Sequence, residues 1–226
     1  MIARSYAWLG LAVLVLGCGA AGDSAARRSV PASSPGSSGE SAPAVVFLGT
    51  SLTAGLGVDP DQAYPAVIQR RLDSLGLRYR VVNAGVSGES SAGAVRRIGW
   101  LLREPPAVLV IETGANDGLR GQDPDSLRRN LQALIDSTRV RAPRTIILLA
   151  AMEALPNLGF GYRRRFRALY PAVARQNGVR LLPFLLTGVA GVDSLNQQDG
   201  IHPTPAGHRR VADNVWPVLR TVLADR

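Results

Sequence analysis

Apolar runs alternate with amphipathic stretches through most of the chain. Five apolar runs predict β-strands, at residues 44–48, 79–82, 107–111, 145–150 and 179–186. Apolar positions at helical spacing predict five α-helices, at residues 64–75, 92–102, 124–140, 162–176 and 204–223. Asp123 is a plausible N-cap for the helix that begins at Pro124, and Asn177-Gly178 is a typical stop for the helix after it.

The order of these elements indicates the fold class. Strands that are apolar on both faces and alternate with helices are typical of a parallel sheet covered by helices on both sides. In such α/β folds the ligand binds at the carboxyl ends of the strands. Polar clusters stand at these ends: Ser51 follows the first predicted strand, Gly88 the second and Asn116 the third. His202 lies in the loop after the fifth.

The N-terminal segment has the features of an export signal. A basic Arg4, an apolar stretch at residues 7–16 and a small residue before Cys18 are typical of a secretory signal peptide. The run Val-Leu-Gly-Cys that ends at Cys18 resembles a bacterial lipobox, which implies cleavage before Cys18 and a diacylglycerol on its thiol. The alternatives are a plain secreted protein with an incidental cysteine, or an uncleaved anchor.

These features divide the chain into three parts. Residues 1–17 are the expected lipoprotein signal peptide. Residues 18–43 are the expected lipidated cysteine and a disordered Ser/Pro/Gly tether, because so few large apolar residues cannot offset the entropy of ordering. Residues 44–226 then form one folded domain of ordinary size. We expect an exported cell-envelope lipoprotein, on a periplasmic or outer-membrane face, that reaches its membrane through Cys18.

The charge balance raises the question of an anionic partner. The chain has 26 basic residues, all arginine, against 17 acidic ones, and its formal net charge is +9. Such a balance can indicate nucleic acid, an anionic membrane surface or an acidic ligand. The arginines are scattered, and their one cluster has the spacing of a solvated helix face; it consists of Arg163, Arg164, Arg165 and Arg167. With no nucleic-acid motif in the sequence, we expect no nucleic-acid partner.

The composition disfavours a protein-bound metal. The single cysteine, Cys18, allows neither an internal disulfide nor a cysteine-based zinc site. The two histidines, His202 and His208, are too few for a catalytic site built from histidines alone. We interpret His208 as structural, because it lies inside the last predicted helix and lacks an acidic partner of the kind that His202 has.

Two segments carry residues suited to nucleophilic catalysis. Ser51 follows a buried strand and lies among glycines, which leaves its hydroxyl exposed, although a helix N-cap would explain the same serine. Asp199 stands three residues before His202. Its carboxylate can fold back to hold the imidazole, so that the other ring nitrogen can deprotonate a serine. A surface turn is the alternative interpretation of this segment.

Two further segments could stabilise developing negative charge. The side-chain amide of Asn116 can donate a hydrogen bond to an oxyanion, and the backbone N–H of Gly88 can do the same. Turn formation explains both segments as well, because Asn, Asp and Gly favour turns.

In combination, these segments resemble a known family. Gly-x-Ser-Leu, Ser-Gly-Glu, Gly-x-Asn-Asp and Asp-Gly-Ile-His-Pro follow one another as in the SGNH (GDSL) hydrolase superfamily. Over residues 44–223 the chain is similar to the TAP-type bacterial thioesterase/lysophospholipase and arylesterase group. The resemblance implies a flavodoxin-like three-layer α/β/α sandwich with a five-stranded parallel sheet. It implies neither a metal nor a cofactor.

The resemblance also implies a role for each of the residues singled out above. Ser51 would be the nucleophile, and His202 the general base and then the general acid. Asp199 would orient His202. The N–H groups of Ser51 and Gly88 and the side chain of Asn116 would form the oxyanion hole.

The chain departs from the family at the residue before Ser51. The family usually has an aspartate there, and this chain has Thr50. That aspartate is regarded as a support for the nucleophile loop. We therefore expect a changed hydrogen bond in the loop and no loss of activity.

An apolar, Gly-rich segment aligns with the mobile substrate loop of the TAP-type enzymes. Its residues Leu155, Leu158 and Phe160 suggest contact with an acyl chain or an aryl group, although packing against the core would also explain them. The expected protein is a serine esterase that hydrolyses carboxylic esters or thioesters of small molecules or lipids through an acyl-enzyme. The alternatives are a carbohydrate O-acetyl esterase of the same superfamily and a non-catalytic, membrane-tethered binding module.

Overall fold

The computed structural model describes residues 42–225. The expected signal peptide, the lipidated Cys18 and the tether up to residue 41 lie outside the described residues. Among the helices that are described, none has the length and apolar character needed to cross a membrane.

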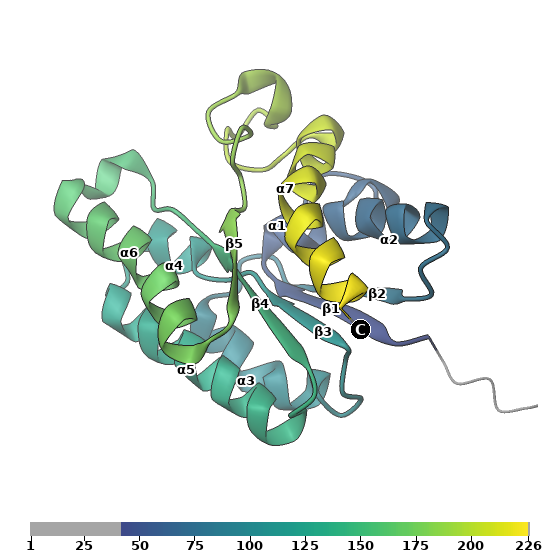
Figure 1. Ribbon diagram of the computed structural model, residues 1–226. Helices are drawn as coiled ribbons and strands as arrows, with labels where there is room; N and C mark the ends of the chain where they lie inside the picture. The colour runs from purple at the N-terminus through teal and green to yellow at the C-terminus, as the bar shows by residue number, and fades with distance from the viewer. Residues whose placement is uncertain (1–41, 226) are drawn as a thin grey trace, which may run out of the picture. The chain divides into compact units, whose positions relative to one another are not determined.

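One parallel sheet forms the centre of the domain. Its five strands are β1 (Ala44–Gly49), β2 (Arg80–Gly85), β3 (Val108–Ile111), β4 (Ile146–Ala151) and β5 (Arg180–Phe184). The strands are ordered β2-β1-β3-β4-β5, and each neighbouring pair is parallel (Figure 1). This is the strand order of flavodoxin-like folds, so the predicted fold class is confirmed. From β1 the chain adds β2 on one side and β3, β4 and β5 on the other, so the order of the strands reverses between β1 and β3. In such folds, ligands bind at this point of reversal.

Helices cover both faces of the sheet. The longer ones are α2 (Tyr64–Ser74), α3 (Ser91–Leu101), α5 (Pro124–Arg141), α6 (Phe160–Asn177) and α7 (Pro205–Ala224). Helices α2 and α7 pack together on one face, while α3, α5 and α6 lie in a row on the other (Figure 1). The remaining elements are the short helices α1 (Ser51–Ala54) and α4 (Ala115–Leu119), and the 3-10 turns η1 (Pro60–Gln62), η2 (Pro156–Leu158) and η3 (Asp193–Leu195).

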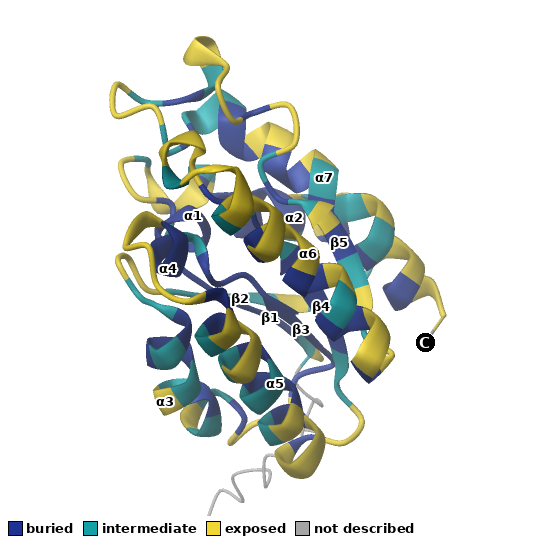
Figure 2. Cartoon of the chain, turned by 90° about the vertical axis from the view of Figure 1, so that its left-hand side faces the viewer, coloured by how far each residue is buried: buried dark blue, intermediate teal, exposed yellow. Residues whose placement is uncertain are grey.

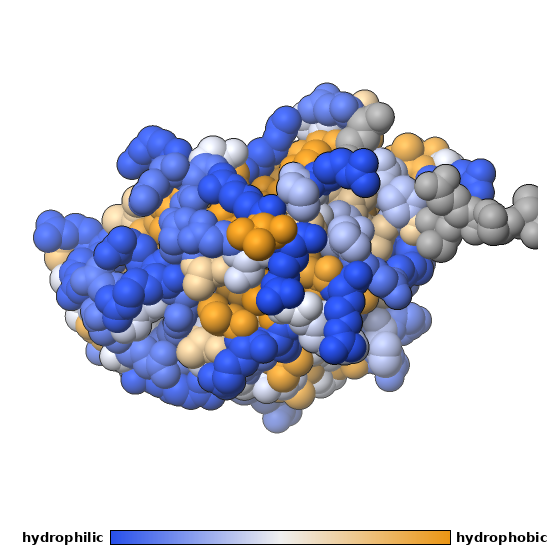
Figure 3. Space-filling model, turned by 90° about the horizontal axis from the view of Figure 1, so that it is seen from below, coloured by the Kyte–Doolittle hydropathy of each residue, from blue (hydrophilic) through white to orange (hydrophobic). Residues whose placement is uncertain are grey.

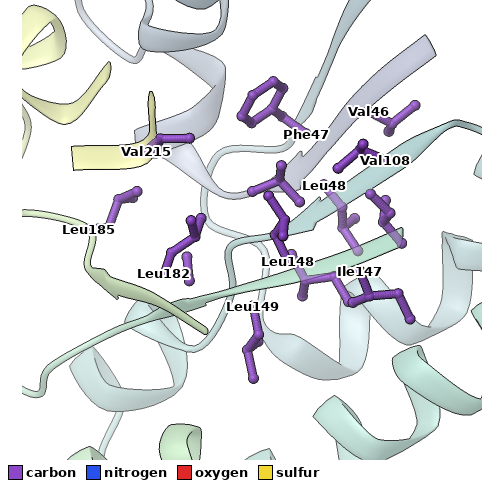
Figure 4. Close-up of a cluster of buried hydrophobic side chains, with 14 of the residues drawn as sticks. Val46, Phe47, Leu48, Val108, Ile147, Leu148, Leu149, Leu182, Leu185 and Val215 are labelled. Atoms are coloured by element: carbon purple, nitrogen blue, oxygen red, sulfur yellow. The ribbon is translucent and has the colours of Figure 1, made fainter. Parts of the chain in front are cut away.

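The hydrophobic core fills the space between the sheet and the helices. All four residues of β3 are buried, as its apolar sequence Val-Leu-Val-Ile predicts. The helices turn buried sides toward the sheet and exposed sides outward (Figure 2). Apolar side chains from β1, β3, β4, β5 and α7 meet in the cluster shown in Figure 4. Tyr64 of α2 closes one edge of this core, with its ring 5.5 Å from that of Phe47 and nearly perpendicular to it.

All of the predicted strands and helices are present, with ends that differ by a few residues. Helices α1 and α4 are not predicted from the sequence, because they contain only 4 and 5 residues and are too short to show a helical period. Both follow strands at the carboxyl edge of the sheet. They carry Ser51 and Asn116, so the missed helices are the ones that hold candidate site residues.

Exposed apolar side chains occur on several elements. The face seen in Figure 3 is mainly hydrophilic, with apolar residues in small groups. Trp100 in α3 and Val140 in α5 are 65% and 82% exposed, and isolated residues of this kind are common on protein surfaces. Leu56, Leu119 and Leu155 are exposed as well, but these three line a single pocket at the candidate site.

Candidate active site

The chain turns sharply from β1 into α1, and this turn presents Ser51. A Cβ atom on Gly49 would lie 1.9 Å from Thr53 Oγ1, so the close approach of α1 to the strand requires glycine. Thr50, not Ser51, occupies the N-cap position, and its side chain makes no capping hydrogen bond. The hydroxyl of Ser51 is therefore not used as a helix cap. Ser51 as a whole is 9% exposed, and it lines a pocket.

Asp199, His202 and Ser51 form a continuous chain of hydrogen bonds. His202 Nδ1 lies 2.6 Å from Asp199 Oδ2, and His202 Nε2 lies 2.9 Å from Ser51 Oγ. The other carboxylate oxygen accepts the N–H groups of Ile201 and His202, both at 3.0 Å. These bonds, first that of the His202 side chain, lower the pKa of Asp199 to about 2. The segment is a surface turn, and the turn itself holds the imidazole toward Ser51.

Gln197 connects the His202 loop to the segment after α1. Its side-chain amide donates hydrogen bonds to the carbonyl oxygens of Leu56 and Pro203, at 2.7 and 3.0 Å. Its backbone N–H donates to the carbonyl of His202 at 2.8 Å. This role of Gln197 is not predicted from the sequence, because a glutamine in a loop carries no signal of such a contact.

The two further oxyanion candidates lie side by side in the structure. Gly88 has a φ of +77°, which favours glycine, and the carbonyl of Gly88 accepts a hydrogen bond from Arg120 at 2.8 Å. Asn116 is buried in the first turn of α4. Its side-chain Nδ2 donates to the carbonyl of Glu89 at 3.0 Å, so the amide touches the same loop that carries Gly88.

Ion pairs and hydrogen bonds of charged side chains hold this loop in place. Arg97 donates to both carboxylate oxygens of Glu89, at 2.7 to 2.9 Å, and also to the carbonyl of Gly49 at 3.3 Å. Buried Asp117 accepts the backbone N–H of Ser91 at 2.9 Å and its hydroxyl at 2.5 Å. The glutamate of Ser-Gly-Glu and the aspartate of Gly-x-Asn-Asp therefore support the loop and do not face the pocket.

A buried glutamate holds the residue before Ser51. Glu112 follows β3, is 0% exposed, and accepts the backbone N–H of Thr50 at 2.7 Å. It also accepts the hydroxyls of Thr50, at 3.0 Å, and of Thr53, at 2.8 Å. Burial raises the pKa of Glu112, and these hydrogen bonds oppose the rise. Thr50 thus takes part in a buried hydrogen-bond network with Glu112, and no motif in the sequence indicates this partner.

One pocket of about 610 Å³ opens over these groups. Ser51, Gly88, Asn116 and His202 all line it. The rest of the lining is mainly apolar and includes Leu52, Leu56, Leu119, Met152, Ala154, Leu155, Leu186 and Ile201. The structure therefore brings the nucleophile candidate, its base and the oxyanion candidates to the wall of one apolar cavity.

The predicted substrate loop divides between three environments. Leu155 lines the catalytic pocket. Leu158 packs against the hydrophobic core, which is the alternative that the sequence left open. Phe160 is 77% exposed and lines a second pocket next to the first. Within residues 42–225, no group of three His, Cys, Asp or Glu side chains could hold a metal ion.

His208 lies away from the pocket and serves packing. It is 1% exposed, and its Nδ1 accepts the backbone N–H of Tyr64 at 3.3 Å, which ties α7 to α2. Burial, and to a smaller extent the charge of His202, lower the pKa of His208 to about 4. An uncharged, buried imidazole fits the structural role predicted from the sequence.

The sequence and the fold are similar to those of known hydrolases. The model of the GDSL-like lipase/acylhydrolase family matches residues 47–210, which contain all the site residues described above. Esterase TesA of Pseudomonas aeruginosa is 43% identical over 180 residues, which are 79% of this chain and 89% of that protein. Thioesterase 1/protease 1/lysophospholipase L1 of Escherichia coli is 34% identical over 170 residues, 75% of this chain and 79% of that protein.

A solved structure supports the same likeness. The crystal structure of TesA matches with a TM-score of 0.76 and 43% sequence identity, and the match covers 79% of this chain and 99% of the crystallised one. About four fifths of this chain therefore corresponds to nearly the whole of the crystallised chain. Because residues 42–225 hold the whole sheet and both helix layers, we expect this part to fold without the N-terminal segment.

Proposed function

We propose that Ser51, His202 and Asp199 are the catalytic residues of this protein. The chain belongs to the GDSL-like lipase/acylhydrolase family and is a serine esterase. We further propose that it hydrolyses esters or thioesters with an apolar acyl chain, through an acyl-enzyme on Ser51. One observation carries the proposal. The Ser51 hydroxyl lies 2.9 Å from His202 Nε2 and faces a pocket lined mainly by apolar side chains.

Asp199 and His202 prepare the nucleophile. The Asp199 carboxylate accepts the Nδ1–H of His202, which leaves an unprotonated Nε2 toward Ser51. Nε2 takes the hydroxyl proton while Ser51 Oγ forms a bond to the acyl carbon, and the carbonyl electron pair moves onto the oxygen. Asp199 stays ionised because its pKa is lowered, so its charge stabilises the imidazolium.

The oxyanion candidates act on the charge that develops on this oxygen. Asn116 uses one amide N–H for the carbonyl of Glu89, and an amide has a second N–H to donate to substrate. The N–H groups of Ser51 and Gly88 complete the proposed hole. When the tetrahedral intermediate collapses, the bond to the leaving alcohol or thiol breaks and His202 gives it the proton. Water then repeats the attack, with His202 as base, and releases the carboxylic acid.

The shape of the pocket supports an acyl chain longer than acetyl. An acetyl group would leave most of a cavity of about 610 Å³ unfilled. Each methylene buried against apolar walls contributes about 0.8 kcal/mol. Longer acyl chains should therefore bind more tightly until the cavity is full. An O-acetyl esterase would not need an apolar cavity of this size.

Hydrolysis of p-nitrophenyl esters from acetyl to palmitoyl tests the proposal. The assay uses residues 42–226 beside Ser51→Ala, with folding of both proteins checked by circular dichroism. We expect activity that is lost in Ser51→Ala and an optimum at a chain longer than acetyl. An acetyl optimum would favour the carbohydrate O-acetyl esterase. A folded protein with no activity on any ester would favour the binding module.

We also propose that a lipid on Cys18 anchors the exported domain to a membrane of the cell envelope. The support is the basic start, apolar stretch and small residue before Cys18. Two or three acyl chains suffice for stable anchoring. Cells fed labelled palmitate should label the full chain but not Cys18→Ser. Equal labelling of both proteins would contradict the anchor.

A further inference from the structure

Gln197 and His202 lie opposite each other at the base of one turn. The backbone N–H of Gln197 donates to the carbonyl of His202 at 2.8 Å, and the N–H of Gly200 donates to the carbonyl of Gln197 at 2.9 Å. The Asp199 carboxylate holds the His202 ring within the same turn. The turn therefore sets how His202 is oriented on its own loop. It does not set where this loop lies relative to α1, which carries Ser51.

The side-chain amide of Gln197 joins this turn to the segment that follows α1. It donates to the carbonyl of Leu56 at 2.7 Å, and its second hydrogen bond, to the carbonyl of Pro203, keeps it on the turn. In the part of the chain that the structure describes, the contact of His202 with Ser51 is the only other hydrogen bond between residues 50–58 and residues 193–204. The amide is thus the polar link that stands beside the reactive contact.

These contacts close a ring of hydrogen bonds that includes both reactive side chains. The N–H of Leu56 donates to the carbonyl of Ser51 at 3.0 Å. From Leu56 the ring passes through Gln197 to His202, and it returns to the Ser51 hydroxyl at 2.9 Å. Because the other sides of the ring are hydrogen bonds of ordinary length, they constrain the side between His202 Nε2 and Ser51 Oγ.

We propose that Gln197 is a positioning residue that keeps His202 at hydrogen-bond distance from Ser51. The inference rests on the proposed function, in which His202 is the base and Ser51 the nucleophile. Gln197 itself lines neither of the two pockets at the site. An effect of its replacement on catalysis would therefore not come from a lost contact with substrate.

Gly57 leaves the space that this amide occupies. It has a φ of +81°, and a Cβ atom on it would lie 2.1 Å from Gln197 Oε1 and 2.8 Å from Gln197 Nε2. A side chain at residue 57 would therefore push the amide away from the carbonyl of Leu56. The link can thus be removed from either side, by changing Gln197 or by changing Gly57.

Two substitutions that remove the same link by different routes test this inference. Gln197→Met keeps a long side chain but has no N–H to donate. Gly57→Ala keeps the amide and displaces it. Gln198→Met is the matched control, because Gln198 is the exposed neighbour of Gln197 and lines neither pocket. These variants of residues 42–226, the double variant and the native domain are assayed on p-nitrophenyl octanoate, with folding and melting followed by circular dichroism.

We expect Gln197→Met to lower kcat by about tenfold or more, because a misplacement of about 1 Å typically costs about 100-fold in rate. KM should stay within about twofold of the native value. Gly57→Ala should lower kcat by a similar factor. The double variant should be no slower than the slower single variant, since the second substitution has no link left to remove. Gln198→Met should match the native domain.

Any of four results would overturn the positioning role. They are native kcat in either folded single variant, a rise in KM with kcat unchanged, losses that multiply in the double variant, and an equal loss in Gln198→Met. A lower melting temperature with native kcat would mean that Gln197 only stabilises the turn. Ser51→Ala, run in parallel, separates this failure from failure of the proposed function. If the native domain hydrolyses the ester no faster than Ser51→Ala, the proposed catalytic residues are wrong.

Discussion

Hydrogen bonds around Ser51 fall into two groups with different tasks. His202 contacts the hydroxyl itself at 2.9 Å, and Asp199 contacts the other side of the His202 ring at 2.6 Å. Glu112 acts on the backbone and hydroxyl of Thr50, the residue before Ser51. If Ser51 is the nucleophile as proposed, the first group affects its reactivity and the second affects its position. Substitutions in the two groups should therefore produce different defects.

Asn116→Ala should slow the chemical step. Loss of one oxyanion donor typically costs about 2.7–4 kcal/mol, or about 100- to 1000-fold in kcat. The domain should stay folded, because the substitution removes one hydrogen bond, to the carbonyl of Glu89. Stopped-flow or steady-state kinetics on p-nitrophenyl octanoate measure the effect, beside a thermal melt. Native turnover in this variant would exclude Asn116 from the oxyanion hole.

Glu112→Gln should change how stability depends on pH. Burial raises the pKa of Glu112 in the folded protein above its ordinary value of 4.5. Its contribution is therefore full below that value and is lost as pH rises through the folded-state pKa. A glutamine cannot ionise, so the native domain should lose stability relative to Glu112→Gln as pH rises from 4.5. Urea unfolding of both proteins at several pH values measures this difference, and a difference independent of pH would contradict it.

At the scale of elements, the site depends on how closely α1 lies over the sheet. Gly49 and Gly85 face each other at the ends of β1 and β2. Neither has room for a side chain, since a Cβ on Gly85 would lie 2.2 Å from the backbone nitrogen of Ala54. The two glycines let α1 sit against β2, and this sets the position of Ser51 relative to His202.

Gly85→Ala should displace α1 and reduce activity. The clash is with backbone atoms of Ala54 and Thr50, so no change of rotamer can relieve it. A displacement of about 1 Å typically costs about 100-fold in rate. Gly99→Ala in α3 is the matched control, because its nearest neighbours would lie 3.5 Å away. We expect kcat to fall in the first variant and stay unchanged in the second; a fully active Gly85→Ala would show that α1 is adaptable.

At the scale of the whole molecule, the site exists because loops from all five strands meet at one edge. Ser51 follows β1, Gly88 follows β2, Asn116 follows β3, Leu155 follows β4, and His202 follows β5. These residues are far apart in the sequence, and only the folded sheet brings them together. The geometry of the site should therefore be lost when the fold is lost. Conditions that loosen the packing of the helix layers should therefore remove activity and structure together.

His208 makes the fold sensitive to acid. Its pKa is lowered from 6.5 to about 4 in the folded protein, so the unfolded chain binds a proton more readily. Stability is full above pH 6.5 and falls as pH drops toward 4, by up to about 3 kcal/mol. His208→Asn keeps an acceptor for the N–H of Tyr64 but cannot titrate. Urea unfolding between pH 4 and 7 should show a smaller acid loss in this variant, and identical slopes would rule out His208 as the cause.

The sequence by itself determined the strands, the long helices and the candidate reactive residues. Apolar runs and helical spacing depend on neighbours within a few positions, so they can be recognised along the chain. The alternation of strands and helices predicted a parallel sheet, and the rule that ligands bind at the carboxyl ends of its strands placed Ser51, Asn116 and His202 at the same edge. The alternatives that remained for these residues, an N-cap and two turns, were local structures that the same residues also favour.

Only the tertiary structure decided which side chains face the site and which support it. Glu112 acts on a threonine 62 positions away, and Gln197 on a carbonyl 141 positions away. Arg163 and Arg165 are two residues apart, yet one lines both pockets and the other pairs with Asp123. Such contacts depend on which surfaces pack together. Local preferences along the chain carry no information about that packing.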